Sequence, residues 1–209
     1  MKGLVQSLFK QSRFLFIVSV AVPFIFATNI RADAQEAGEL GIKLQSINFE
    51  DISDSKAYAS VFGYINTTPN AAIGFEIGTA NIEDETYYSG GNRFEESIDF
   101  TPIEVNFKLR AKSRGETGFA LDLGGGVSYN VLSYTLYDVN NVKVADENKN
   151  LFGWQAFVSG KYFFTPPRAS FGIFAGAEIK YQWVDSFTEY GEEIDLSNTR
   201  FGIELGVMF

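Results

Sequence analysis

Apolar and polar residues alternate with a period of two along eight segments of the chain. Because successive side chains of a β-strand point to opposite faces, this alternation predicts strands with one apolar face. No segment beyond the N-terminal region shows a helical stripe, so we expect one all-β domain. The predicted strands cover residues 40–49, 56–65, 71–80, 98–112, 118–132, 151–164, 169–184 and 199–209.

The last predicted strand has the clearest pattern. Its bulky apolar residues alternate with Gly202, Glu204 and Gly206, and the sequence ends on an aromatic residue. A free C-terminus usually frays, so this ending favours a strand that closes a sheet and faces hydrocarbon. The last strand of a soluble β-sandwich is the alternative. The apolar face consists of Phe201, Ile203, Leu205, Val207 and Phe209.

The connections between the predicted strands alternate in length. Residues 66–70, 113–117 and 165–170 form short turns that contain Pro or Gly. The longer connections, residues 50–55, 81–97, 133–150 and 185–198, all fall at the opposite end. Bacterial outer-membrane barrels show this arrangement, with short periplasmic turns and long extracellular loops.

Pairs of aromatic residues mark a constant distance along three strands. Phe119 and Tyr129 are ten residues apart, as are Trp154 and Phe164, and Phe171 and Tyr181. Ten residues of a tilted strand rise roughly 25 Å, which is the height of the apolar band between the two aromatic girdles of a transmembrane barrel. The spacing therefore supports membrane-spanning strands.

The two faces of the strands differ in charge. The face predicted to contact lipid carries uncharged residues such as Ile42, Phe107 and Ile173, whereas the opposite face mixes charged residues with glycines. Eight strands leave an interior that side chains just fill, so we expect these ions to form a network inside the barrel. A narrow ion pathway is the alternative. The predicted interior ions are Lys43, Glu76, Glu104, Lys108, Arg110, Asp122, Lys161, Glu178, Lys180, Arg200 and Glu204.

The second strand is ambiguous, because both of its faces are apolar. Ala57, Ala59, Val61, Gly63 and Ile65 compete with Tyr58, Phe62 and Tyr64 for the lipid face. We assign the set that contains Val61 and Ile65 to lipid.

The N-terminal region has the plan of a secretory signal. Basic residues precede an apolar run at residues 14–27, and Ala32-Asp33-Ala34 supplies a cleavage site. We expect a signal peptide at residues 1–34 and a barrel domain at residues 35–209, with cleavage after Ala27 as the competing choice. Loss of four cations and one anion changes the formal net charge from −9 to −12. This charge argues against nucleic acid as a partner.

The composition excludes several kinds of catalysis. The chain contains no His and no Cys, which removes Ser-His-Asp chemistry and His-ligated zinc. Gly124-Gly125-Gly126 does not match a phosphate-binding loop, because no helix follows it and no Lys-Ser or Lys-Thr pair closes it. The acidic clusters Glu83-Asp84-Glu85 and Glu189, Glu192, Glu193 and Asp195 lack the spacing of a calcium loop, and solvated loop charge is the favoured interpretation. We expect no enzymatic activity, no cofactor and no metal.

The predicted signal, alternating strands, sorted loops and terminal Phe209 resemble the small eight-stranded outer-membrane barrels of the OmpA and OmpX type. The resemblance implies an antiparallel up-and-down transmembrane β-barrel in the cell outer membrane, in contact with lipid and lipopolysaccharide. It also implies insertion by periplasmic chaperones and the barrel-assembly machinery, with the apolar set of the last strand matching the assembly signal. Lipid A-modifying barrels of this size depend on a catalytic His, which this chain lacks.

The expected function is therefore non-enzymatic. The barrel would display acidic extracellular loops for envelope integrity, adhesion or binding of a partner whose identity the sequence does not give. Tyr87, Tyr88, Tyr134, Tyr137 and Tyr190 lie in or near these loops and suit either an interface or an aromatic girdle. Two alternatives are a narrow, porin-like solute or ion channel and a soluble lipocalin-like barrel with its apolar face turned inward.

Overall fold

The computed structural model describes residues 38–50, 54–68, 70–89, 92–112, 118–138, 140, 142–165, 171–189 and 192–209. The expected signal peptide and both candidate cleavage sites lie outside these residues. Within the described ranges, no helix is long and apolar enough to cross a membrane.

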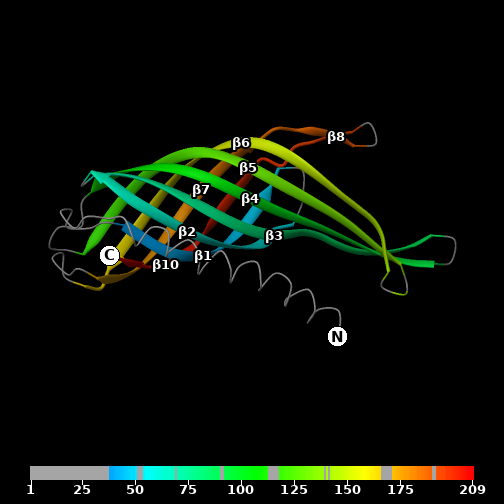
Figure 1. The fold of residues 1–209 in the computed structure, drawn as a ribbon, viewed down its shortest axis with the longest axis horizontal. Coiled ribbons are helices and arrows are strands. Elements are labelled where there is room, and N and C mark those ends of the chain that lie inside the picture. The colour runs from blue at the N-terminus through cyan, green and yellow to red at the C-terminus, as the bar shows by residue number, and fades with distance from the viewer. Residues whose placement is uncertain are drawn as a thin grey trace.

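Eight antiparallel strands close a barrel in the order β1-β10-β7-β6-β5-β4-β3-β2. Barrel strands that follow one another in the sequence are neighbours in the barrel wall, as Figure 1 shows. The predicted eight-stranded up-and-down barrel is thereby confirmed. The barrel strands are β1 (Gly38–Phe49), β2 (Lys56–Thr68), β3 (Ala71–Ser89), β4 (Asn92–Lys112), β5 (Phe119–Asp138), β6 (Lys143–Phe163), β7 (Gly172–Val184) and β10 (Asn198–Met208).

The first and last strands close the barrel wall. β1 pairs with β10 from Glu39↔Met208 to Phe49↔Asn198. The ladder continues to the final residue, because Gly38 N donates to Phe209 O at 2.9 Å and Phe209 N donates to Gly38 O at 3.1 Å. Closure satisfies the backbone groups that an edge strand would leave open, as a sheet in lipid requires.

The predicted strand boundaries are wrong at one end of the barrel. Residues 81–89, 92–97, 133–138 and 143–150, which were expected to be in loops, continue the strands β3 to β6. The ladders run on to Ser89↔Asn92, Phe94↔Asp138 and Tyr137↔Lys143. Outside a membrane both faces of a strand can be polar, so the apolar alternation ends while backbone pairing continues.

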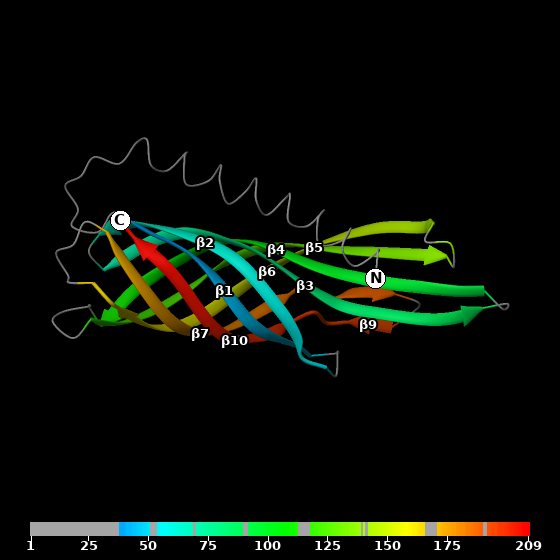
Figure 2. The same ribbon diagram turned by 90° about the horizontal axis from the view of Figure 1, so that it is seen from below.

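These four strands form an extension sheet beyond the barrel, which we define as residues 81–89, 92–99, 133–138 and 143–150. Figure 2 shows β3 and β4 extending far past β1, β2 and β10. β3 shifts register between Asn81 and Glu83, where it leaves its neighbour β2, whose last pair is Tyr58↔Ala80. A bulge commonly redirects a strand at such a point.

The last long connection, expected to be a loop at residues 185–198, holds a short hairpin. β8 (Phe187–Glu189) pairs with β9 (Glu192–Ile194) in a sheet separate from the barrel wall. We call the end of the barrel with these projections the extension end and the opposite end, where Figure 1 marks the C-terminus, the turn end.

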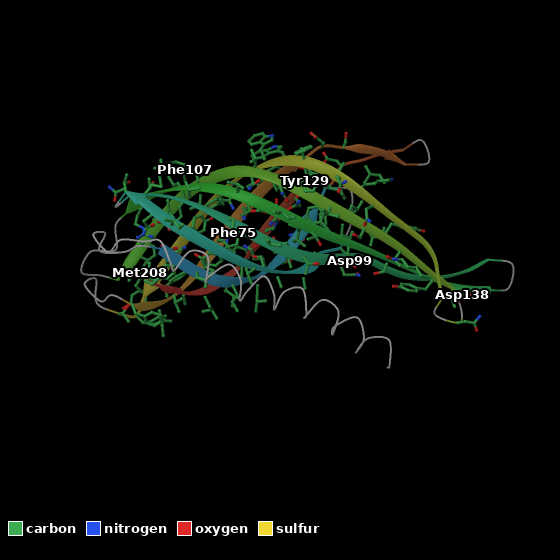
Figure 3. The ribbon with its side chains drawn as sticks, in the orientation of Figure 1. Phe75, Asp99, Phe107, Tyr129, Asp138 and Met208 are labelled. Atoms are coloured by element: carbon green, nitrogen blue, oxygen red, sulfur yellow. The ribbon has the colours of Figure 1, made fainter. Side chains whose placement is uncertain are left out.

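Apolar side chains cover the outside of the barrel. Val127 is 62% exposed and Phe201 60% exposed, and the predicted lipid-facing residues Ile42, Ile103, Leu123 and Ile179 also face outward. Figure 3 shows Phe107 and Tyr129 at this outer surface. In β2, Tyr58, Phe62 and Tyr64 are buried while Val61 and Ile65 are half-buried. Because most strands turn their apolar face outward, the lipocalin-like alternative, which required that face to point inward, is wrong.

Candidate functional site: the charged interior

Every predicted interior ion lies on the inner face of the barrel. Ten of them are exposed by 3% or less, and the side chain of Arg110 is 7% exposed. They form two clusters rather than one evenly spread network. Each cluster is held by residues from strands on several sides of the barrel.

The turn-end cluster is centred on Glu39, which the sequence prediction omitted. Glu39 Oε2 lies 2.6 Å from Lys108 Nζ and 2.7 Å from Lys161 Nζ. Its other oxygen lies 2.6 Å from Arg110 Nη2. Three cations and three anions balance here. The members are Glu39, Lys108, Arg110, Asp122, Lys161 and Glu204.

Glu39 was missed because the first strand was predicted to begin at Leu40. The alternation indicated an inward position for Glu39, since Glu39 and Gly41 lie an even number of residues from the interior residue Lys43. Extending the alternation four residues backward from Lys43 would have found it. With Glu39 included, the interior holds six cations and six anions instead of six and five.

The central cluster is centred on three buried cations. Lys43 Nζ lies 2.7 Å from carboxylate oxygens of both Glu76 and Glu178. Lys180 Nζ lies 2.7 Å from Glu76 and 2.7 Å from Glu104. Arg200 Nη1 lies 2.7 Å from Glu104 Oε1. Its three cations and three anions also balance, and this matters because an unpaired buried charge costs several kcal/mol.

A chain of uncharged polar side chains continues the central cluster toward the extension end. Arg200 Nη1 donates to Tyr58 OH at 2.9 Å, and Arg200 Nε donates to Asn198 Oδ1 at 3.1 Å. Gln182 Nε2 donates to Ser128 Oγ at 2.7 Å and to Asn130 Oδ1 at 3.0 Å. Ser128, Asn130, Gln182 and Asn198 were not among the predicted interior residues, although they occupy inward positions of the alternation.

Aromatic rings pack among the cations. Lys108 Nζ lies 4.2 Å from the ring centre of Tyr64, and Lys161 Nζ lies 4.8 Å from that of Phe174. These distances permit cation–π attraction, which adds to the carboxylate pairs. The buried apolar residues around the turn-end cluster are Phe62, Tyr64, Ala72, Ala120, Phe157, Phe163, Phe174 and Met208.

A second apolar cluster occupies the interior at the extension end. Phe49 and Phe100 meet edge to face with ring centres 5.3 Å apart. Leu196, from the segment after β9, is 2% exposed and joins this cluster. Its buried residues are Ile47, Phe49, Tyr58, Ala80, Ile82, Phe100, Leu132, Leu151, Val184 and Leu196. Apolar side chains thus pack among the ions at the turn end and fill the interior beyond them at the extension end.

The remaining predicted features are located only in part. Among the described residues, no group of three Asp, Glu, His or Cys could hold a metal ion. Asp195 Oδ1 accepts a hydrogen bond from Ser197 N at 2.7 Å. Tyr134 and Tyr137 are half-buried on β5. The side chains of Glu83, Asp84, Glu85, Tyr87, Tyr88, Glu189, Tyr190, Glu192 and Glu193 lie outside the described part of the chain.

The assembly-signal residues occupy one outward face of β10. Phe201 is 60%, Ile203 54% and Leu205 46% exposed, and Phe209 is 37% exposed beside Gly38 of β1. Val207 is half-buried on the same face. This placement is compatible with recognition of the strand before closure.

Comparison with known proteins gives the family. The model of the outer membrane protein beta-barrel domain matches residues 17–209. The barrel of Neisserial surface protein A is similar, with a TM-score of 0.54 and 10% identity over 84% of this chain and 96% of that one. The N-terminal barrel domain of Pseudomonas aeruginosa OprF has a TM-score of 0.50 and 12% identity, over 82% and 97%.

A search of curated proteins finds no significant match. The structural likenesses show the fold, and the family model covers most of the chain. The predicted resemblance and cellular location are thereby confirmed. The chain belongs to the outer membrane protein beta-barrel domain family and is a protein of the cell outer membrane.

Proposed function

We propose that this protein is a non-enzymatic, non-conducting barrel that displays an acidic surface outside the cell for binding a partner. The observation that carries the proposal is the filled interior. Twelve ions pair within two balanced clusters, aromatic rings pack among them, and an apolar cluster fills the interior at the extension end. Such an interior supports a rigid anchor better than a water-filled passage.

The charge of the two ends supports display. The segments at the extension end, residues 50–56, 81–99, 133–150 and 185–198, contain seventeen Asp or Glu and four Lys or Arg. The turn segments 66–70, 111–118 and 164–171 contain three Lys or Arg and one Glu. Because the interior is balanced, the net negative charge resides at the extension end, which we assign to the outside of the cell. Such a surface attracts cationic partners.

The extension sheet adds a second supporting feature. β2 pairs with β3 no further than Ala80, and β7 pairs with β6 no earlier than Gly153. Beyond these residues β3 and β6 are the two outer strands of the extension sheet. Outer strands present backbone groups to which an extended segment of a partner can add.

Planar-bilayer recording tests the closed interior. We expect no steady conductance from the full chain, nor from the Lys108→Met and Glu104→Gln variants that fold. A steady conductance that either substitution alters would overturn the closed interior and favour the narrow, porin-like channel. Heat modifiability in SDS gels would establish that each recorded variant is folded.

Protease treatment of intact cells tests display. We expect cuts within residues 81–97, 133–150 and 185–198, because these segments would lie outside the cell. Cuts restricted to residues 66–70, 113–117 and 165–170 would reverse the orientation and refute the proposal. Permeabilised cells provide the control for access to the turn end.

A further inference from the structure

A cluster of aromatic rings and carboxylates lies on the outer surface at the rim of β6 and β7. Trp154 and Trp183 are register partners and stack with ring centres 3.7 Å apart and an interplanar angle of 9°. Tyr181 meets Trp183 edge to face at 4.4 Å. Trp154 is 55% exposed, so the stack presents an open ring face.

Two acidic residues lie at this rim, one placed by a side-chain contact and one by the position of its backbone. The Tyr181 hydroxyl donates to Glu50 Oε1, which brings that carboxylate to the edge of the cluster. Asp185 follows Trp183 by two residues, and its backbone N donates to Phe152 O at 2.9 Å. Glu50 and Asp185 are both exposed. The rim-level π face is therefore bordered by the Glu50 carboxylate, and Asp185 lies at the same rim.

This combination differs from what an anchor for lipid headgroups would need. Aromatic residues at a membrane interface suit lipid contact. However, carboxylates at the same level repel the phosphates of lipid headgroups. An electron-rich ring face beside carboxylates instead suits a cation, which the ring attracts from above and the carboxylate from the side.

We propose that this cluster binds arginine side chains of an extracellular peptide. The inference rests on the proposed function, since it names the chemistry of the partner that the display surface would bind. A guanidinium group can stack on the open face of Trp154 while its N–H groups pair with Asp185 or Glu50. An ammonium group lacks the planar shape needed for both contacts at once.

The chain offers a direct optical readout, because Trp154 and Trp183 are its two tryptophans. The full chain, folded in detergent micelles, is titrated with an octa-arginine peptide carrying a fluorescent label. Peptide anisotropy measures binding, while tryptophan emission reports whether the stack is occupied. Octa-lysine tests the cation type, and vesicles containing amine lipids test lipid as the alternative source of charge.

We expect octa-arginine to bind with a change in tryptophan emission. The Glu50→Gln/Asp185→Asn double variant keeps the shape of the cluster and should weaken binding about tenfold. Trp183→Leu should also weaken it. Asp99→Asn is the matched control, because it removes one acidic group at the same end away from the stack and should change affinity by less than about twofold.

Equal loss of affinity in Asp99→Asn and Asp185→Asn would overturn the site in favour of diffuse attraction. Binding with unchanged tryptophan emission, equal affinity for octa-lysine, or a response to amine lipids alone would also overturn it. Such a result leaves the bilayer recordings unaffected. Conversely, conductance with intact arginine binding would refute only the closed interior.

Discussion

Lys180 Nζ lies 2.7 Å from Glu76 Oε2, although the two residues are 104 positions apart and stand on opposite walls of the barrel. β7 and β3, which carry them, are separated by three strands in either direction around the wall. The pair therefore spans the interior. It connects strands that backbone hydrogen bonds do not join, and it occupies space through which water would otherwise pass.

The Lys180→Met variant should lose much of this connection. Lys180 also reaches Glu104 at 2.7 Å, so its removal leaves two buried carboxylates with one cation fewer. We expect the unfolding free energy to fall by about 3–5 kcal/mol, as for other broken buried pairs. Urea unfolding in detergent measures it. The exposed Lys143→Met is the control, and equal midpoints for the two variants would contradict a structural role.

Because little space is left inside the barrel wall, Gly124→Ala should destabilise the protein. A Cβ at Gly124 would overlap the Phe157 ring and the Phe107 carbonyl. Overpacking of this kind costs about 1–3 kcal/mol. Gly160 on the outer face is the matched control, because a Cβ there would lie 3.6 Å from the Phe119 ring. Thermal unfolding of both variants should separate them, and a stable Gly124→Ala would mean that the interior is loosely packed.

The outward face can be tested with a charge at mid-height. Leu123 is 44% exposed and lies four residues from the girdle residue Phe119 and six from Tyr129. In lipid vesicles, Leu123→Arg should reduce stability by about 2–4 kcal/mol, because the charge would sit near the bilayer centre. Ser133→Arg, in the extension sheet, should have little effect. Unchanged stability of the Leu123→Arg variant would indicate that this face does not contact hydrocarbon.

Acid should loosen the turn between β5 and β6, whose tip region Figure 3 marks at Asp138. Backbone N–H groups of Val142 and Asn140 donate to its carboxylate at 2.9 and 2.8 Å and lower the pKa of Asp138. A lowered folded-state pKa stabilises the turn above the unfolded-state pKa, about 3.9. This contribution is lost as pH falls through the folded-state value.

Hydrogen exchange measures this loss. The Val142 amide should be protected at neutral pH and should exchange faster, relative to the intrinsic rate, once Asp138 is protonated. Asp138→Ala should remove the protection at every pH. Retained protection in that variant would show that the carboxylate does not hold the turn.

Loss of the Phe209 side chain should impair assembly of the barrel more than it lowers the stability of the folded barrel. Phe209 is 37% exposed, so Phe209→Ala should change the unfolding midpoint little while lowering the amount of barrel inserted in cells several-fold. Phe164→Ala removes a 65% exposed aromatic residue just after β6, at the same end of the barrel, and should insert normally. Equal insertion of both variants would refute the proposed assembly signal. Outer-membrane fractionation with heat modifiability provides the measurement.

The barrel and its two faces were predictable because they follow from a local rule. Lys108 and Arg110 alternate with Phe107 and Leu109, and in a strand that alternation allows one sorting of charged and apolar side chains. β2 lacked this contrast. Its aromatic residues were assigned to the interior without such a contrast, and the contact of Tyr58 with Arg200 from β10 agrees with that assignment.

The extension sheet was not predictable from the same rule. Residues 81–89 pair with residues 92–99 by backbone groups, and such pairing leaves no apolar period in the sequence when both faces meet water. Glu39 was missed at a strand end, where the preceding Gly38 gives the alternation no apolar side chain to mark it.

Strand type, inward and outward faces, and the balance of interior charge were thus already present in the order of residues, since each depends on neighbours two positions apart. Which cation meets which carboxylate depended on barrel closure. Lys161 lies 122 positions from Glu39, and only the register of the closed wall brings them within 2.7 Å. The same holds for Trp154 and Trp183, whose stacking requires β6 and β7 to pair in a single register.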